Sequence, residues 1–460
     1  RGIKSVRDCC RPNYNWSAGR VQSPVLKYVL EGMMKKSKLS GYRLSVTLSH
    51  DGVEKRVEIS LKKRGFPGIL RELSKRELGS RDPKVASKRV RDKLSKSFIN
   101  NVEVRLVKLR HDEREVDPPP PFTTDTLLAE ASRTLGFTAS LAMNIAQELF
   151  EVGLITYHRT DSTRVSDAGL AVARQYIEEK YGDTALFKPR QWGTGGAHEC
   201  IRPTRPIDAE RLRELVREGV LDFPIQLRRE HYQLYDLIFR RFIASQMKAA
   251  KVLAEKYGLE FCLKDGAEGE CAKKVSLEQT DYVDVVEPGF LDMYKPFTVD
   301  PKNRLPEVET PVKLVVKDVV FIQPPLPKTH EVVSWMKEKG IGRPSTYAKI
   351  LSTLVERGYV IIRENRLIVA KKGKMVAEFL FKELFPHNAS GRTSWTKTPM
   401  IGVEATRLLE SKMDDVATGK EDYLSVLNAI YSELHGLVLN NDELLSKLRD
   451  RYSFYCGRES

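Results

Sequence analysis

The sequence predicts an α+β chain of several domains, and three observations support this prediction. The first is a length of 460 residues, enough for about three domains of roughly 150 residues each. The second is a content of 41% apolar and 30% charged residues, which is typical of packed globular domains and excludes a wholly disordered chain. The third is a change of hydrophobic period along the chain, from strands to helices, back to strands, and then to a mixture.

The N-terminal part of the chain reads as a short basic helix followed by strands. An apolar run at residues 25–30 predicts the helix, and residues 42–48 and 55–61 alternate around His50-Asp51-Gly52 as the two arms of a hairpin do. Residues 102–110 alternate again. Between these strands, we expect the Lys/Arg-rich stretch 75–96 to be a solvated connection with some helix.

The proline run at residues 118–121 fits neither a helix nor a central strand, and it marks a boundary. Leu141, Ile145 and Leu149 then recur at helical spacing, and helices are expected to about residue 249. Strand patterns return at 252–322.

The last third predicts a helix ended by Gly340, a second helix at residues 346–357, and two strands around a turn at Glu364-Asn365. This order is that of a winged helix, a DNA-binding module. A purely structural α+β piece is the alternative.

The charge balance points to a polyanionic partner. The chain has 77 Lys and Arg against 62 Asp and Glu, a net charge of +15, which favours nucleic acid over a merely basic soluble protein. Six cysteines without a C-x2-C pair suit neither a disulfide scaffold nor a zinc ribbon, and they fit a reducing compartment. No apolar run approaches the ~18 residues of a membrane span, so we expect a soluble, cytoplasmic protein with no membrane partner.

The densest polar motif is GLITYHRTDSTRVS at residues 153–166, which directly follows an apolar helical pattern. Such a cluster is costly to bury without partners. One interpretation is a helix-to-loop junction with an N-cap at Ser162 or Ser166. The other is a site in which Tyr157, a weak nucleophile with an ordinary pKa of about 10, acts beside Arg159. Since the guanidinium would stabilise a phenolate or a pentavalent phosphoryl group, the pair suits transesterification at a phosphodiester.

GLITYHRTDS resembles the active-site signature of the type IA DNA topoisomerases, whose tyrosine forms a 5′-phosphotyrosyl bond with DNA. Three further stretches resemble motifs of the same family in the expected order: SAGRVQSP at 17–24, GGAHECIRPT at 195–204 and KGIGRPSTYAKIL at 339–351. Within the family, the residues of these motifs are most similar to those of the topoisomerase portion of reverse gyrase.

The resemblance implies that Tyr157 is the nucleophile, that Arg159 stabilises the transition state and that His198 assists at the active site or in positioning DNA. A lone histidine is otherwise most often structural. The residues implied to bind DNA are Arg20, Gln22, Ser23, Thr156, Asp161, Glu199, Arg202, Arg343, Ser345, Thr346 and Tyr347. The last four would place phosphates at a helix N-terminus. At two positions, His158 and Cys200, the chain departs from the more common residues of the family's motifs, and both differences look conservative.

The resemblance also implies a fold, the type IA toroid without its Toprim domain. Residues 1–40 and 326–460 would form a discontinuous winged-helix-containing DNA-binding domain. Residues 41–118 and 243–325 would form a β-rich arch, and residues 119–242 a helical domain that bears the catalytic tyrosine. The sequence itself shows only β, then α, then β again.

The acidic D-x-D-x-E-type group, by which a Toprim domain holds Mg²⁺, is missing from this sequence, since no D-x-D occurs in it. We therefore expect no metal ligand in the chain, and Mg²⁺ would be held by residues elsewhere. There is no P-loop either, so ATP would act only through a helicase-like partner module. Because the chain starts at Arg1 rather than Met, it is expected to be either a C-terminal piece of a longer polypeptide or the small subunit of a split, heterodimeric enzyme.

The predicted function is single-strand DNA cleavage and religation with strand passage, as part of a reverse gyrase that introduces positive supercoils with its ATPase partner. The alternatives are a non-catalytic winged-helix DNA-binding subunit and an ordinary ATP-independent topoisomerase I that relaxes negative supercoils. An RNA-processing role has only the charge behind it. The presence of Tyr157 together with Arg159 and His198 favours catalysis, because binding alone needs none of them.

Overall fold

The computed structural model of the chain describes residues 19, 21–34, 38–62, 65–81, 83–193, 198–265, 270–378, 380–381 and 402–439. These residues form two compact units, and each is taken by itself. The winged-helix unit comprises residues 1–31, 125–144 and 326–460, and the sheet unit comprises residues 32–124 and 145–325. The chain is α+β, as predicted, whereas the division into five segments stays a prediction.

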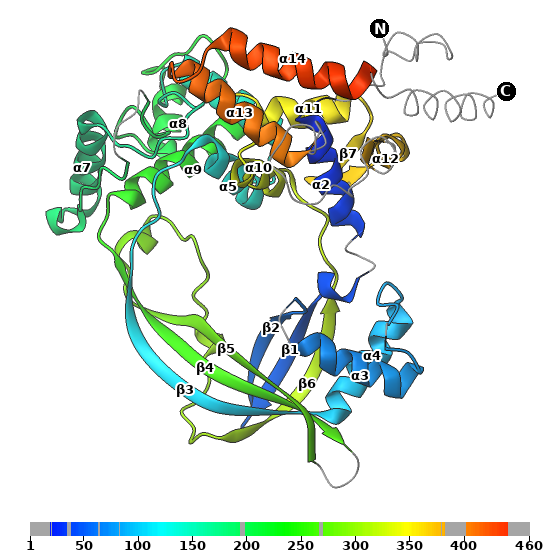
Figure 1. The fold of residues 1–460 in the computed structure, drawn as a ribbon. Helices are drawn as coiled ribbons and strands as arrows, with labels where there is room; N and C mark the ends of the chain where they lie inside the picture. Colours follow the sequence, from blue (N-terminus) through cyan, green and yellow to red (C-terminus); the bar gives the residue numbers. More distant parts are fainter. Residues whose placement is uncertain are drawn as a thin grey trace. The chain divides into compact units, whose positions relative to one another are not determined.

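The sheet unit is built on a six-stranded sheet in the order β2-β1-β6-β3-β4-β5, in which every neighbouring pair is antiparallel (Figure 1). Its strands are β1 (Arg43–His50), β2 (Val53–Ser60), β3 (Val102–Val116), β4 (Ala250–Asp265), β5 (Glu270–Glu287) and β6 (Val312–Ile322). The β1–β2 turn has positive φ at Asp51 (46°) and Gly52 (83°), the conformation of the predicted two-residue hairpin.

A buried ionic network holds this sheet in a curl. Lys55 of β2 is 1% exposed, and its Nζ pairs with Glu255 of β4 and lies 2.9 Å from Asp281 Oδ2 of β5. The second Glu255 oxygen lies 3.0 Å from His111 Nε2 on β3 and accepts the backbone N–H of Leu305 at 2.8 Å. Since β2 and β5 are the two edges of the strand order, one lysine can reach both β4 and β5 only because the sheet bends back on itself.

Two helices cover the apolar side of the curl, α3 (Phe66–Leu78) and α4 (Lys88–Asn101). The Phe66 ring packs edge-on against Phe261 of β4, with ring centroids 5.0 Å apart. The stretch that was expected to be mainly a solvated connection contains most of α4. That helix forms because Leu94 and Phe98 recur four residues apart among the cations, and both are buried in the core.

The sheet unit contains further helices besides α3 and α4. They are the C-terminal part of α6 (Ala139–Glu151), then α7 (Asp167–Tyr181), α8 (Ala209–Arg217) and α9 (Arg229–Ser245), with 3-10 turns at η2 (Leu39–Gly41), η3 (Thr184–Leu186), η4 (Gly289–Asp292) and η5 (Pro301–Asn303). α9 is the central element, because eleven of its residues are buried. Tyr176 of α7 packs edge-on against Phe239 of α9 at 4.7 Å, and this contact anchors α7.

The winged-helix unit has the predicted order of helix, turn, helix and hairpin. Its elements are α2 (Gln22–Met34), α5 (Thr124–Thr134), α10 (Thr329–Glu338), α11 (Tyr347–Glu356), β7 (Val360–Arg363), β8 (Arg366–Val369), α12 (Lys371–Glu378), α13 (Val403–Ala417) and α14 (Tyr423–Leu439). Glu364 and Asn365 form the hairpin turn with φ of 49° and 59°. The Asn365 amide donates to Phe137 O at 2.8 Å and accepts from Thr329 Oγ1 at 2.6 Å, so the wing is fixed by its own turn.

Two observations bear on expectations about cysteines and membranes. Cys262 and Cys271 form a disulfide between β4 and β5, a local cross-link rather than a scaffold. None of the helices that the structure describes is long and apolar enough to cross a membrane.

The buried network predicts that two substitutions in the β1–β2 hairpin, Lys55→Ala and Arg43→Ala, lower the free energy of unfolding by very different amounts. Lys55→Ala should lower the free energy of unfolding by about 3–5 kcal/mol, because it leaves Glu255 buried without its cation. Arg43→Ala, which removes a half-exposed pair with Glu58, should cost less than about 1 kcal/mol. Urea unfolding followed by circular dichroism measures both, and equal losses would show that the network does not constrain the sheet.

Candidate active site

The motif at residues 153–166 forms an irregular segment between α6 and α7. The segment ends at Ser166, the N-cap of α7, whose side chain accepts from Gly169 N at 3.3 Å. Ser166 was one of the two caps expected from the sequence. Ile155 pairs with Pro203 in an isolated antiparallel bridge, which sets this segment, the tyrosine loop (residues 152–166), beside residues 198–204.

Two threonines clamp the tyrosine loop from opposite sides. Thr156 Oγ1 donates to Cys200 O at 2.7 Å and accepts from Arg202 N at 3.0 Å. On the other side, Thr124 Oγ1 donates to His158 O at 2.8 Å and accepts from Thr160 N at 2.9 Å. The chain on each side of Tyr157 is thus held by hydrogen bonds to a different segment, residues 200–202 on one side and the first residue of α5 on the other.

The clamp leaves the Tyr157 side chain accessible. It is 36% exposed and packs edge-on against Phe150 of α6, with ring centroids 5.4 Å apart. The exposed His198 ring lies at 5.1 Å with an interplanar angle of 37°. The structure therefore brings together Tyr157 and His198, two residues 41 positions apart that the sequence analysis placed in one site.

Arg159 is exposed, and two side chains orient its guanidinium. Its Nε donates to His158 Nε2 at 3.3 Å, and its Nη2 donates to Gln147 Oε1 of α6 at 3.2 Å. Gln147 in turn donates to Glu151 Oε1 at 2.7 Å. A neutral His158 that accepts at Nε2 carries its proton on Nδ1, and this atom is buried without a hydrogen-bond partner.

The environment of His158 keeps it uncharged at neutral pH. The ring is fully buried. Burial, followed by the neighbouring charge of Arg159, lowers the pKa of His158 to about 4. A neutral ring retains the lone pair that Arg159 uses, so the orientation of the guanidinium depends on the protonation state of His158.

Glu199 and Arg202 form a partly buried pair behind the tyrosine loop. Arg202 donates from Nε and Nη2 to the two Glu199 oxygens at 2.9 Å each, and Ser166 Oγ donates to Glu199 Oε2 at 2.7 Å. Although burial opposes ionisation, these hydrogen bonds hold the pKa of Glu199 below its ordinary value. Arg202 is 6% exposed and already bonded to Glu199, and its expected contact with DNA stays a prediction.

The remaining expected DNA-binding residues have mixed surroundings. Asp161 is exposed in the tyrosine loop. Gln22 and Ser23 begin α2 in the winged-helix unit, where Ser23 is buried, and Arg20 lies outside the described residues.

The residues expected to bind phosphate at the α11 N-terminus also lie in the winged-helix unit. Tyr347 is buried, and Thr346 Oγ1 accepts from Arg343 N at 2.8 Å within the turn. The Arg343 guanidinium pairs with Asp414 at 2.5 Å and with Glu410 at 3.6 Å, which neutralises its charge locally. Ser345 is exposed. The expected phosphate site therefore stays a prediction, and its arginine already has two carboxylate partners.

The sequence analysis missed three residues that build the site. Gln147 and Phe150 lie three residues apart on α6 and both face the tyrosine loop, and Thr124 clamps the loop from a segment 33 residues before Tyr157. Helical spacing predicts that Gln147 and Phe150 share a face. No sequence pattern marks Thr124, because its bonds are made across the fold.

The residues around Tyr157 do not fit a Mg²⁺ site of the kind that the resemblance implies. Mg²⁺ prefers oxygen ligands in octahedral geometry. Both Glu199 oxygens are bonded to Arg202, and among the residues the structure describes no group of three or more His, Cys, Asp or Glu could hold a metal ion. We derive no step of the reaction through a metal held by this part of the chain.

The lowered pKa of His158 predicts how stability depends on pH. Between about pH 6.5 and pH 4 the unfolded chain binds a proton at this residue that the folded chain does not, so the wild type should lose stability as pH falls through this window. His158→Gln should show a smaller loss, and His198→Gln controls for the removal of an exposed imidazole nearby. Urea unfolding at pH 7 and pH 4.5 measures the difference. An unchanged pH dependence in His158→Gln would contradict the neutral, buried state of the ring.

Comparison with known proteins assigns the family. A family model described as DNA topoisomerase matches residues 5–428. The reverse gyrase of Pyrococcus furiosus is 38% identical over 427 residues, which cover 92% of this chain and 30% of that protein. The reverse gyrase of Pyrobaculum aerophilum is 40% identical over 444 residues, which cover 95% of this chain and 31% of that protein. The chain thus spans slightly less than one third of the length of these curated relatives.

A solved structure leads to the same family. Full-length topoisomerase I from Thermotoga maritima matches with a TM-score of 0.63 and 26% sequence identity, over 92% of this chain and 63% of that one. The family model and the structural match each cover most of the chain. The chain therefore belongs to the type IA DNA topoisomerases, and it is related over most of its length to the topoisomerase portion of reverse gyrase.

Proposed function

We propose that this chain carries the cleavage and religation centre of a type IA topoisomerase, with Tyr157 as the nucleophile. The observation that supports this most directly is the state of the Tyr157 side chain. Its loop is clamped by Thr124 and Thr156, yet its phenol stays accessible beside His198. Such a combination of a fixed backbone and an exposed reactive group suits a residue that must meet a phosphodiester in one defined geometry.

The proposed reaction is a reversible transesterification. Tyr157 Oη loses its proton and attacks the phosphorus of one DNA strand, the bond from phosphorus to O3′ breaks, and O3′ leaves as a hydroxyl after taking up a proton. The product is a 5′-phosphotyrosyl bond, which conserves the energy of the phosphodiester, so the reverse attack by the 3′-hydroxyl reseals the strand without another energy source. Arg159 would stabilise the extra negative charge of the pentavalent transition state.

The parts that this centre needs are proposed to lie in another polypeptide portion. The carboxylates for Mg²⁺ would come from a Toprim portion, and ATP would act through a helicase-like module. The relation to reverse gyrases over less than a third of their length supports this arrangement, because it leaves room for both parts. With both parts present, we propose that strand passage introduces positive supercoils. Without the ATPase module, the same centre would relax negative supercoils.

A covalent adduct with DNA should depend on Tyr157. Incubated with a 3′-labelled single strand, Mg²⁺ and a Toprim-bearing polypeptide, and then denatured, the wild-type chain should carry label on a gel, since the fragment held by a 5′-phosphotyrosyl bond includes the 3′ end. Tyr157→Phe should reduce the label to background. Tyr423→Phe, at a tyrosine that is 62% exposed in the winged-helix unit, is the matched control and should keep the adduct. Label retained by Tyr157→Phe would place the nucleophile elsewhere.

If the Mg²⁺-binding and ATPase portions lie outside this chain, the behaviour of the 460-residue chain alone can be predicted. It should bind DNA but fail to relax a negatively supercoiled plasmid, with or without Mg²⁺, because the described residues offer no oxygen ligand set for the ion. Addition of a Toprim-bearing polypeptide should restore Mg²⁺-dependent relaxation, and a helicase-like ATPase portion together with ATP should give positive supercoils. Agarose electrophoresis of the plasmid measures all three. Relaxation by the chain alone, at the rate of the reconstituted enzyme, would show that the metal-binding residues lie within it.

A further inference from the structure

The positive charge of the chain is concentrated in one segment of the sheet unit. Residues 62–101 hold thirteen Lys and Arg against four Asp and Glu, a net charge of +9, while the whole chain carries +15. This segment contains α3 and α4 and contributes nothing to the Tyr157 site. Most of the excess charge is therefore not explained by the cleavage centre.

Three of these cations form a regular stripe on α4. Arg89, Lys93 and Lys96 are exposed and follow each other at i, i+4 and i+7, so they share one face of the helix, here called the basic stripe. The opposite face carries Leu94 and Phe98, which are buried in the core. At 1.5 Å per residue the stripe is about 10.5 Å long, close to the rise of three nucleotides along one strand of duplex DNA.

The basic stripe differs from most cations of the strands, which have a carboxylate partner. Elsewhere on the sheet, cations pair across strands: Lys256 Nζ lies 2.9 Å from Asp112, Lys274 Nζ 2.8 Å from Glu260, and Lys108 Nζ 3.7 Å from Glu278. Among the described residues, no carboxylate pairs with Arg89, Lys93 or Lys96. Like charges at i, i+4, here Arg89 and Lys93, destabilise a helix by a few tenths of a kcal/mol. The one carboxylate on α4, Asp92, lies three residues after Arg89 and four before Lys96, and it forms no ion pair with either among the described residues.

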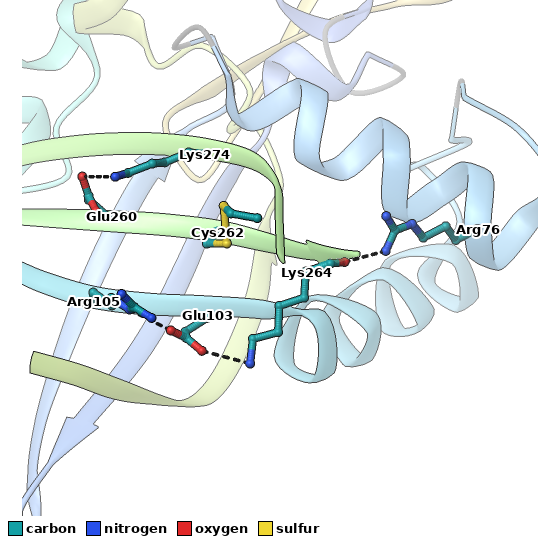
Figure 2. Close-up of a disulfide and its surroundings, with 8 residues drawn as sticks. Arg76, Glu103, Arg105, Glu260, Cys262, Lys264 and Lys274 are labelled. Atoms are coloured by element: carbon teal, nitrogen blue, oxygen red, sulfur yellow. Dashed lines mark hydrogen bonds and ion pairs between the residues drawn. A yellow bond between two sulfur atoms is a disulfide. The ribbon is translucent and has the colours of Figure 1, made fainter. Parts of the chain in front are cut away.

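The stripe has a rigid support. Beneath it, Phe98 packs against Phe261 of β4 with ring centroids 6.4 Å apart, and the next residue along β4, Cys262, is cross-linked to Cys271 of β5 (Figure 2). Arg76 of α3 donates to Lys264 O at 2.8 Å, which ties the helical pair to the same end of β4 (Figure 2). A fixed row of unpaired cations suits a partner whose own charges are regularly spaced.

Cations are concentrated at the end of the sheet that holds Lys264 of β4, even around a carboxylate. Glu103 is contacted by Arg105 Nε at 2.8 Å and Lys264 Nζ at 2.9 Å (Figure 2). Lys313 Nζ lies 3.2 Å from it as well, so three cations share one carboxylate. The hydrogen bond from Lys264, opposed by burial and assisted by the other two cations, lowers the pKa of Glu103 to about 2. The carboxylate is thus always ionised near neutral pH, and the group still carries an excess of two positive charges.

We propose that the basic stripe is a binding surface for the phosphate backbone of duplex DNA, distinct from the residues of the Tyr157 site. DNA is chosen as the polyanion because of the proposed function, and to that extent the inference rests on it. Duplex is favoured over single-stranded DNA because surfaces for single strands use exposed aromatic rings as stacking platforms, and the one aromatic residue of α4, Phe98, is buried. Contacts of this kind read charge and spacing without reading sequence.

The test measures binding of the full chain to a fluorescein-labelled 30-base-pair duplex at several salt concentrations. Each lost phosphate contact reduces the slope of log K against log salt by about 0.9 on duplex DNA, so R89A/K93A/K96A should reduce it by about 2.7 and weaken binding more than about ten-fold at 0.1 M salt. The charge-preserving variant R89K/K93R/K96R should bind like the wild type.

A second control separates the effect of the basic stripe on DNA binding from the effect of net charge. K108A/K256A/K274A removes three positive charges from the same unit at positions that already have carboxylate partners. It should change the slope by less than about one unit. Equal weakening by the two triple variants, or an unchanged slope in R89A/K93A/K96A, would overturn the proposal. Circular dichroism checks that each variant is folded.

The inference and the proposed function fail in different ways. R89A/K93A/K96A should still form the covalent adduct with a short single strand when the Toprim-bearing polypeptide is present, and Tyr157→Phe should still bind the duplex with the wild-type slope. Loss of adduct formation in the stripe variant would mean that these cations belong to the cleavage centre, and the proposal of a separate surface would be wrong.

Discussion

The sheet unit depends on one buried interaction, the ion pair between Lys55 and Glu255. A lysine and a glutamate that are both almost fully buried tolerate the loss of water only where hydrogen bonds satisfy their remaining groups, and here His111, Asp281 and the Leu305 amide do so. Together with Asp281 of β5, the pair joins the two ends of the strand order and so sets the curl of β3 and β4. Because β3 leads directly into the segment that holds Thr124, the same curl decides where one of the two clamps on the tyrosine loop is placed.

The site beyond this clamp separates buried side chains, which are bonded to their neighbours, from exposed ones. Glu199, Arg202 and His158 are wholly or partly buried and are bonded to their neighbours, whereas Tyr157, Arg159 and His198 stay exposed. Arg202, which the resemblance placed among the DNA-binding residues, is buried here. Its guanidinium is bonded to Glu199 and Ser166, beside the segment that presents His198. The separation also gives His158 a function that its residue type alone does not suggest, because its neutral ring supplies an acceptor for Arg159.

Local features of the fold were predictable from the sequence, and contacts between distant segments were not. Asp51-Gly52 and Glu364-Asn365 were recognised as hairpin turns because few residues tolerate positive φ, and the structure confirms both. The meeting of Tyr157 with His198 was predicted through the resemblance to a family, not through spacing. The partner of Lys55 lies 200 residues away, and Gln147 and Thr124 reach the tyrosine loop through folds of the chain that no periodicity encodes. For the same reason, the two carboxylates of α13 that pair with Arg343 were invisible in the sequence.

The charge of the chain shows how far a composition argument can go without a structure. A net charge of +15 indicated a polyanionic partner, but it did not show which cations are available to one. Most cations on the strands face carboxylates on neighbouring strands, so they contribute to the folded sheet and little to the surrounding electrostatic field. The cations of α4 stand apart because the helix repeats them on its outer face while its inner face is committed to the core. The position of a charge relative to its nearest carboxylate, more than the total, therefore decides which cations of this chain are available to a polyanion.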